Sequence, residues 1–231
     1  MSNQQIVVYI EELQLVAQKT NNYSLYLAKK VNDSFTAIWL AKGPVSVPGQ
    51  SSYQYKNIFD ISTISFMVNF ASAPIKEGDI TFTSGGKNLA IQTGQTTTLN
   101  QYGVFSPPKN NGTPGEIIID NQLDADIHEI LLDSTGQNIW ANCTEPMSVG
   151  ISTMTPKNQF QLWFGSFQGL GSLIRGNVSN PIIVDVNDDE TKTITYNNSG
   201  NWVAGEPAIR LSDTEISELN ARVKRAVMRA A

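Results

Sequence analysis

Short apolar segments, each followed by a cluster of turn-forming residues, recur along most of this chain and constrain its fold more than any other feature. In residues 64–71, apolar side chains occupy every second position, which would place them on one face of an extended strand. Similar segments follow one another at a spacing of roughly 8–12 residues, as in antiparallel sandwiches and barrels. The sequence therefore predicts an all-β fold, an antiparallel β-sandwich or a partly closed barrel.

The expected strands begin with a three-strand meander over residues 13–17, 23–28 and 35–41. A helix over residues 11–19 competes with the first of these strands, because the period of so short a segment is ambiguous. Further strands are expected at 52–57, 64–71, 80–83, 88–92, 117–119, 127–132, 138–143, 147–154, 159–167, 182–186 and 191–196. The turns at 84–87 and 187–189 are each expected to join two of them as a hairpin.

The composition agrees with a β-rich body. Only 16% of the 231 residues are charged, whereas helical bundles usually carry more Glu and Lys. A chain of this length suits one large all-β domain. The best candidate for a linker, residues 106–115, is rich in Pro, Gly and Asn but short. We therefore expect a single β-sandwich domain over residues 1–211.

The last segment, residues 212–231, has a different character and predicts an amphipathic helix. Ser212 and Glu215 have the spacing of a capping box, in which each side chain bonds the backbone amide of the other residue. Apolar residues then recur at helical spacing at Ile216, Leu219, Val223 and Val227. We expect this apolar stripe to pack on the β body. A contact between subunits and binding to a membrane surface are the alternatives.

The chain contains one histidine, His128, and one cysteine, Cys143. This scarcity excludes a zinc site built from three histidines, four cysteines or two of each, and it excludes an intrachain disulfide. Cys143 follows Trp140 in an apolar segment, and free cysteines are usually buried. We therefore expect Cys143 to lie in the core.

The charge distribution argues against a nucleic-acid partner. Residues 1–211 hold 12 basic and 18 acidic residues, a net charge of -6, and residues 212–231 hold 4 basic and 3 acidic residues, a net charge of +1. Neutralising phosphates requires clustered Lys and Arg instead. The N-terminus lacks the pattern of a signal peptide, no segment is apolar over the length of a membrane span, and a single thiol suits a reducing compartment. We expect a cytoplasmic protein, with a membrane as an unfavoured partner.

One candidate metal site is visible. Asp124, Asp126 and His128 alternate, so on a strand they would share one face and could hold a divalent cation. The alternative is a solvated turn that leads into a strand. A second acidic segment begins at Asp185 like a calcium-binding loop, but its sixth position is Glu190 instead of Gly and its twelfth is Tyr196 instead of Glu. We expect a turn there.

The sequence predicts no enzyme. It contains no phosphate-binding loop, no nucleophile elbow and no complete dinucleotide fingerprint. A hydrolase with two catalytic carboxylates stays open, because 21 acidic residues offer many pairs and nothing singles one out.

Aromatic and amide side chains give the strongest indication of a ligand site. Trp163 and Gln161 would share one face of the strand over residues 159–167, and Tyr53 and Tyr55 would share a face of the strand over 52–57. An indole beside amides can stack on a sugar ring or another flat ligand and bond its polar edge. The alternative is a strand buried between two layers, apolar on both faces.

Residues 158–164, 182–186 and the late Gly200-Asn201-Trp202 resemble segments of small cytosolic β-sandwich proteins of fungi. That group includes fruiting-body lectins and a coloured, chromophore-binding protein. The resemblance covers residues 35–203 in style and contains no diagnostic motif, so it transfers no functional residue. It implies a ligand-binding protein without a leader sequence.

We therefore expect a non-enzymatic binding protein for a small carbohydrate or chromophore-like ligand. A second copy of the same chain, in a homo-oligomer, is the candidate protein partner. The expected ligand-binding residues are Trp163, Gln161, Tyr53 and Tyr55, and a bound chromophore or a divalent cation is the candidate cofactor. The alternative function is that of a toxin-like or membrane-active protein that oligomerises through its C-terminal helix.

Overall fold

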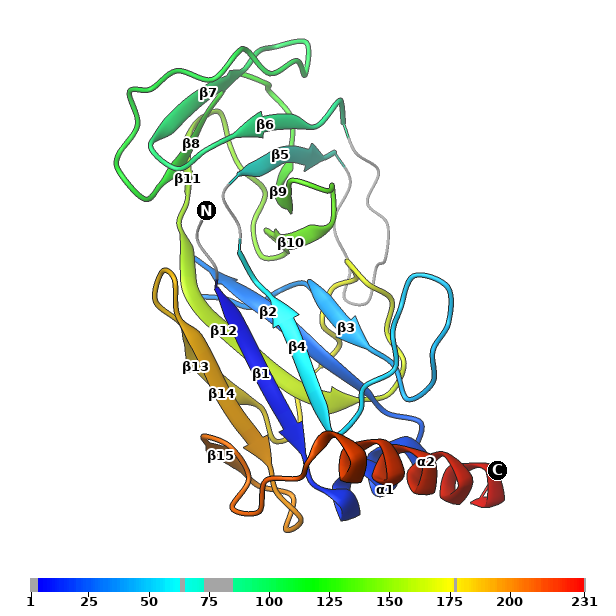
Figure 1. Cartoon of the computed structure of the whole chain (residues 1–231). Coiled ribbons are helices and arrows are strands. Elements are labelled where there is room, and N and C mark those ends of the chain that lie inside the picture. The colour runs from blue at the N-terminus through cyan, green and yellow to red at the C-terminus, as the bar shows by residue number, and fades with distance from the viewer. Residues whose placement is uncertain (1–3, 63–64, 73–84, 177, 231) are drawn as a thin grey trace.

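The computed structural model describes residues 4–62, 65–72, 85–176 and 178–230. Four sheets form two lobes (Figure 1). The basal lobe holds the strands from the two ends of the chain together with both helices, and the distal lobe holds the strands between residues 66 and 154. None of the four sheets closes into a barrel in the part of the chain that the structure describes. The predicted all-β fold with a C-terminal helix is confirmed, and its sheets are open.

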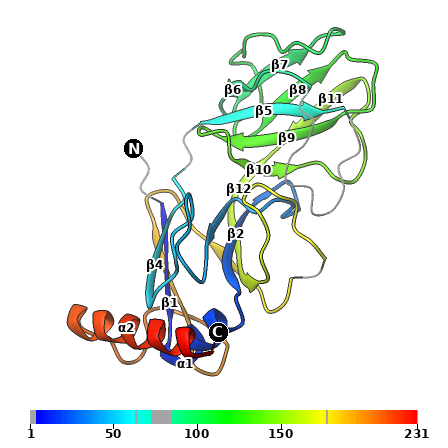
Figure 2. The same ribbon diagram turned by 90° about the vertical axis from the view of Figure 1, so that its right-hand side faces the viewer.

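The basal lobe consists of two four-stranded sheets, which Figure 2 shows as separate layers. The first has the order β15-β14-β1-β4, in which β1 is parallel to β14 and antiparallel to β4. The second has the order β13-β12-β2-β3, and its neighbouring strands are antiparallel. The strands are β1 (Gln5–Ile10), β2 (Ser24–Val31), β3 (Leu40–Lys42), β4 (Lys56–Asp60), β12 (Pro156–Gly165), β13 (Ile182–Asp185), β14 (Thr191–Tyr196) and β15 (Trp202–Ala204).

The distal lobe has one sheet of order β10-β9-β5-β6 and one of order β11-β8-β7, in which β7 runs parallel to β8. The strands are β5 (Phe66–Ala71), β6 (Leu89–Ile91), β7 (Gln95–Leu99), β8 (Ile117–Asn121), β9 (His128–Asp133), β10 (Asn138–Ala141) and β11 (Gly150–Met154). One cluster of buried side chains runs through both lobes, from Ile6 and Leu162 to Val68 and Leu131. The two lobes therefore share a hydrophobic core.

A helix, α1 (Glu12–Thr20), replaces the first expected strand. The strand prediction over residues 13–17 is wrong, and the competing helix is correct. Leu15 is fully buried whereas Leu13 is largely exposed, so the two residues do not share a face as they would in a strand. Asn22 stops the helix by adopting a left-handed conformation, with a φ of 56°, which asparagine tolerates better than most residues.

The C-terminal helix is α2 (Asp213–Ala230), and it lies beside α1 across the end of the basal lobe (Figure 2). Its predicted capping box forms: Ser212 N donates to Glu215 Oε2 at 2.8 Å, and Glu215 N donates to Ser212 Oγ at 3.4 Å. Leu219 and Val223 are buried in the core. The expected packing of the apolar stripe on the body is confirmed.

Several strand predictions need correction. The hairpin expected around residues 187–189 does not form, because β13 pairs with β12 and β14 pairs with β1 in the other sheet. The turn itself exists, and the Glu190 carboxylate accepts a hydrogen bond from the Asn187 amide at 2.7 Å. β1 and β7 were not predicted, since each is a run of similar side chains without alternation. The expected strand at 80–83 lies outside the described residues.

The segment expected as a strand over residues 35–41 is regular only from Leu40, where β3 begins. Before that point it pairs with a loop: Ile38 N donates to Ser172 O at 2.9 Å, and Gly171 N donates to Ile38 O at 2.8 Å. This pairing holds the loop after β12 against the outer face of the β2–β12 sheet. No helix in the part of the chain that the structure describes is long and apolar enough to cross a membrane.

Candidate ligand-binding site

The structure separates the four residues predicted to bind a ligand. Trp163, Tyr53 and Tyr55 are 2%, 0% and 3% exposed, so none of them presents an open ring face to solvent. Gln161 is half-buried in β12, opposite Ala28 on one side and Ile183 on the other. The expected exposed aromatic patches do not form. The two tyrosines also lie outside any regular strand, in the segment that precedes β4.

Tyr53 and Tyr55 serve to pack the basal lobe. The Tyr53 hydroxyl donates to Tyr23 O at 2.9 Å, and the Tyr53 ring lies edge-on to Phe164 at 5.5 Å. Burial raises the pKa of Tyr53 above its ordinary value. The Tyr55 hydroxyl donates to Ile209 O at 3.3 Å, just before α2. These contacts join the chain segments around them, and both hydroxyls are used in hydrogen bonds to the backbone.

Trp163 occupies the outer face of β12. Phe160 and Leu162 point into the main core, as the alternation of a strand requires, and Trp163 points to the opposite side. It faces Tyr26 on β2, with the ring centroids 5.4 Å apart. The Tyr26 hydroxyl in turn accepts a hydrogen bond of 2.7 Å from Gln168 N and so anchors the covering loop. The strand is thus covered on both faces, which was the alternative prediction.

Trp163 nevertheless lines a pocket of about 410 Å³ beside this loop. The loop wall carries Gln168, Arg175 and Asn180, and all residues that line the pocket are Gln18, Tyr23, Trp163, Phe164, Gly165, Ser166, Gln168, Arg175, Val178, Ser179, Asn180 and Tyr196. We call it the Trp163 pocket. Its lining combines aromatic rings, side-chain amides and one guanidinium group.

The indole N–H of Trp163 makes no hydrogen bond to the described part of the protein. Within the described residues, Trp163 Nε1 has no hydrogen-bond acceptor, and no buried side-chain nitrogen or oxygen lacks a partner. The indole N–H must therefore reach solvent, although the ring is almost completely covered. Gly165 lies beside it, and a Cβ at that position would stand 3.4 Å from Nε1. A side chain at position 165 would therefore contact the indole N–H, and glycine leaves that space open.

A cluster of three aromatic rings, two of which line the pocket, supports its floor. Trp202 lies parallel to Phe164 with centroids 5.9 Å apart, and Tyr196 contacts Trp202 at 4.7 Å. Trp202 Nε1 donates to Asn180 O at 2.9 Å. Asn180 has a φ of 47°, and its side chain donates to Gly200 O at 2.9 Å. The rim of the pocket is thereby fixed to β15 and to the turn that precedes it.

The predicted metal residues do not come together. Asp124 and Asp126 are exposed in the turn before β9, whereas His128 is buried in the strand, so the three do not share a strand face. The His128 ring bonds through Nδ1 to Asn142 O at 2.9 Å. Within the described residues, His, Cys, Asp and Glu form no group of three that could hold a metal ion. Asp124 and Asp126 instead lie in an exposed turn that leads into β9, as the alternative prediction stated.

The prediction that Cys143 lies in the core is wrong. Its side chain is exposed in the segment after β10, which ends at Ala141, two residues earlier than expected. Trp140 is buried, with Nε1 donating to Ser34 Oγ at 2.9 Å. The chain therefore leaves the sheet between the two residues, and the apolar segment does not extend to the cysteine.

The chain matches no protein-family model, no curated protein and no solved structure. The geometry of the pocket therefore carries the functional interpretation. Of the four residues expected to bind a ligand, only Trp163 lines the Trp163 pocket. The other polar residues of its lining, such as Gln18, Arg175 and Asn180, come from distant segments. No local sequence pattern could have grouped them.

Proposed function

We propose that this chain is a non-enzymatic binding protein and that the Trp163 pocket takes a small carbohydrate ring. The observation that carries the proposal is the Trp163 indole N–H, which has no protein acceptor within the described residues and belongs to a side chain that lines a pocket with amide groups on its wall. Pockets of a few hundred Å³ are typical of small-molecule sites. The resemblance of the sequence to small β-sandwich proteins of fungi supports the same class of protein. A chromophore-like ligand would contact the same aromatic residues of the pocket.

The chemistry of the lining suits a sugar. Hydroxyl groups of a sugar both donate and accept, and they can be satisfied by an indole N–H, by amides such as those of Gln18 and Gln168, and by the Arg175 guanidinium. The rings of Tyr23 and Phe164 offer apolar surface for the C–H faces of a sugar. A reducing compartment such as the cytoplasm agrees with a single exposed thiol.

A glycan array probed with the purified full chain tests the proposal. We expect one family of glycans to bind, and we expect the best monosaccharide to bind about tenfold more weakly to Trp163→Phe, which keeps a smaller aromatic ring but lacks the N–H. Gly165→Ala, whose methyl group would stand 3.4 Å from Nε1, should weaken binding as well. Arg225→Gln on α2, outside the pocket, is the control.

A blank array with a colourless preparation would contradict the proposal. A visible absorption band in the purified protein, lost in Gly165→Ala, would instead identify a chromophore as the ligand of this pocket. The alternative function, a membrane-active protein that oligomerises through α2, would gain support from binding to liposomes together with a blank array. If this function used the apolar stripe of α2, the helix would have to leave the body and expose Leu219 and Val223.

A further inference from the structure

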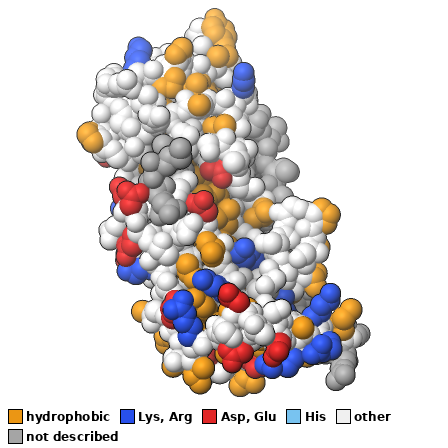
Figure 3. All heavy atoms as spheres, viewed as in Figure 1, with side chains coloured by type: hydrophobic (Ala, Val, Ile, Leu, Met, Phe, Trp, Pro, Cys, Tyr) orange, Lys and Arg blue, Asp and Glu red, His pale blue; other side chains and the backbone are white. Residues whose placement is uncertain are grey.

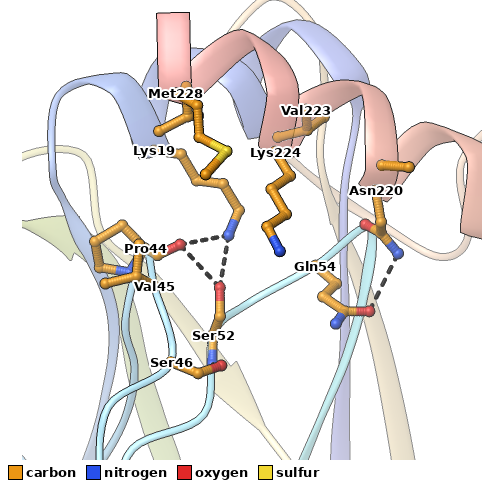
Figure 4. Close-up of a pocket in the computed structure, with 12 residues that line it drawn as sticks. Lys19, Pro44, Val45, Ser46, Ser52, Gln54, Asn220, Val223, Lys224 and Met228 are labelled. Carbon is orange, nitrogen blue, oxygen red and sulfur yellow. Dashed lines mark hydrogen bonds between the residues drawn. The ribbon is translucent and has the colours of Figure 1, made fainter. Parts of the chain in front are cut away.

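A second pocket, larger than the Trp163 pocket, lies beneath α2 (Figure 4). It has a volume of about 600 Å³ and is bounded by α2, the end of α1 and the segment between β3 and β4 (Figure 4). We call it the α2 pocket. Its lining residues are Lys19, Pro44, Val45, Ser46, Ser52, Gln54, Asn220, Ala221, Val223, Lys224, Val227 and Met228.

The charge in the α2 pocket is positive. Lys19 and Lys224 are its charged lining residues, and Figure 4 shows both side chains extending into the same space. Lys19 Nζ donates to Pro44 O and to Ser52 Oγ, at 2.6 Å each. Both acceptors are neutral, and an ammonium group has three donors. Within the described residues no carboxylate pairs with either lysine, so the pocket offers an uncompensated positive charge.

Burial makes this charge sensitive to an anion. It lowers the pKa of Lys19 to about 8, so the group is still mostly protonated at pH 7 but poorly solvated. The Lys19 ammonium also lies over the Tyr53 ring, 4.6 Å from its centroid. The acidic residue of α1, Glu12, forms an ion pair of 3.0 Å with Arg222 on α2 and not with Lys19. The buried ammonium group has lost part of its hydration. A bound anion would compensate for that loss by pairing with its charge.

Apart from the lysines, the pocket is lined by the polar residues Ser46, Ser52, Gln54 and Asn220 and by apolar residues that are partly open to solvent. Pro44, Val45 and Met228 form one side, and Val223 and Val227 line the helix above them. Val45 is 57% exposed and Met228 is 70% exposed, although both belong to the wall of a pocket. Figure 3 shows that charged side chains gather around the two helices, with hydrophobic side chains between them. Covering Val45 and Met228 would remove apolar surface from water, which is favourable.

We propose that the α2 pocket binds a single-chain carboxylate amphiphile, with its head group on Lys19 and Lys224 and its hydrocarbon chain along Val45, Val227 and Met228. The two lysines lie beside the apolar side chains of Val45 and Met228 (Figure 4), so one bound molecule could contact both a positive charge and apolar surface. A pocket of about 600 Å³ lies in the range of single small-molecule sites. The two pockets share no lining residue, although Gln18 of the Trp163 pocket and Lys19 of the α2 pocket are neighbours in α1.

Isothermal titration calorimetry of the full chain with dodecanoate, at pH 7 and below its micelle concentration, tests the proposal. We expect binding at one site, and binding at least tenfold weaker for dodecyltrimethylammonium, which has the same chain and the opposite charge. Lys224→Gln should weaken dodecanoate binding about tenfold, since it removes one charged donor without disturbing the core. Met228→Ser should also weaken dodecanoate binding, because the hydrocarbon chain of the ligand loses an apolar contact.

Two controls locate the effect. Arg225→Gln removes a positive charge from the same helix outside the pocket and should leave the affinity unchanged. Trp163→Phe should also leave it unchanged, because Trp163 does not line the α2 pocket. Three results would each overturn the proposal: no binding of dodecanoate, equal binding of the cationic amphiphile, or an affinity that Lys224→Gln does not alter. The last would indicate adsorption of the chain to exposed apolar surface.

Discussion

Trp202 donates its indole hydrogen to the backbone carbonyl of Asn180 at 2.9 Å, and this bond ties β15 to the rim of the Trp163 pocket. The same Trp202 ring stacks on Phe164, which lines the pocket floor. One side chain therefore supports the pocket from below and holds its rim in place.

Trp202→Phe separates these two contributions. The phenyl ring retains stacking on Phe164 but cannot donate to Asn180, so we expect faster amide hydrogen exchange at residues 178–180 and a loss of about 1 kcal/mol in the free energy of unfolding. Hydrogen exchange with mass spectrometry and urea denaturation measure the two effects. Unchanged exchange at the rim would show that the Gly200 contact of Asn180 holds it without Trp202.

Ser212→Ala tests the cap of α2. Ser212 Oγ accepts from Glu215 N at 3.4 Å, and its own amide donates to the Glu215 carboxylate at 2.8 Å. Loss of the cap should lower the free energy of unfolding by about 1 kcal/mol, measured by urea denaturation. Ser217→Ala, an exposed position within the same helix, is the matched control and should be neutral or slightly stabilising. Equal destabilisation by both variants would remove the cap as the cause.

The sequence predicted the class of the fold and the C-terminal helix because these depend on local patterns. The cap of Ser212 and Glu215 and the stripe through Leu219 and Val223 involve residues close together in the chain, and both form as expected. Segments in which long-range pairing decides the structure were predicted less well. β1 joins the sheet through parallel pairing with β14, at the other end of the chain, which no local period can show.

The candidate site illustrates the same limit. Trp163 was identified from its own strand, but whether its ring is open depends on the loop that Tyr26 and Ile38 hold over it. Tyr53 and Tyr55 have the same alternation as an exposed aromatic patch and are buried all the same. A period of two distinguishes the two faces of a strand, and it does not tell which layers cover them.

The exposed thiol of Cys143 leads to a chemical prediction. Only the thiolate reacts with a disulfide reagent, and partial burial raises the pKa of Cys143 above its ordinary value. We expect the native protein to react with one equivalent of 5,5′-dithiobis(2-nitrobenzoate), more slowly than free cysteine at pH 7 and faster as the pH rises. A thiol that reacts only after denaturation would contradict the exposed position found here.

Lys29 is a buried charge that should destabilise the fold at neutral pH. It is 3% exposed on β2, with Nζ 4.5 Å from the centroid of the Phe160 ring. Desolvation lowers its pKa to about 8, although the charge of Asp188 opposes the shift. Between pH 8 and about 10.5 the unfolded state therefore binds more protons than the folded state, so this group makes the free energy of unfolding rise with pH over that window.

Lys29→Met removes the charge but keeps an apolar side chain of similar length. We expect a gain on the order of 1–3 kcal/mol in the free energy of unfolding at pH 7, and a smaller gain at pH 10, where Lys29 of the native protein is already neutral. Urea denaturation at both pH values measures the difference. Lys30→Met, one position along the strand, is the matched control, because Lys30 faces the opposite side and bonds Gln159 Oε1 at 2.9 Å. If both variants respond to pH alike, or if Lys29→Met destabilises the protein at pH 7, the Lys29 charge is better compensated than its burial indicates.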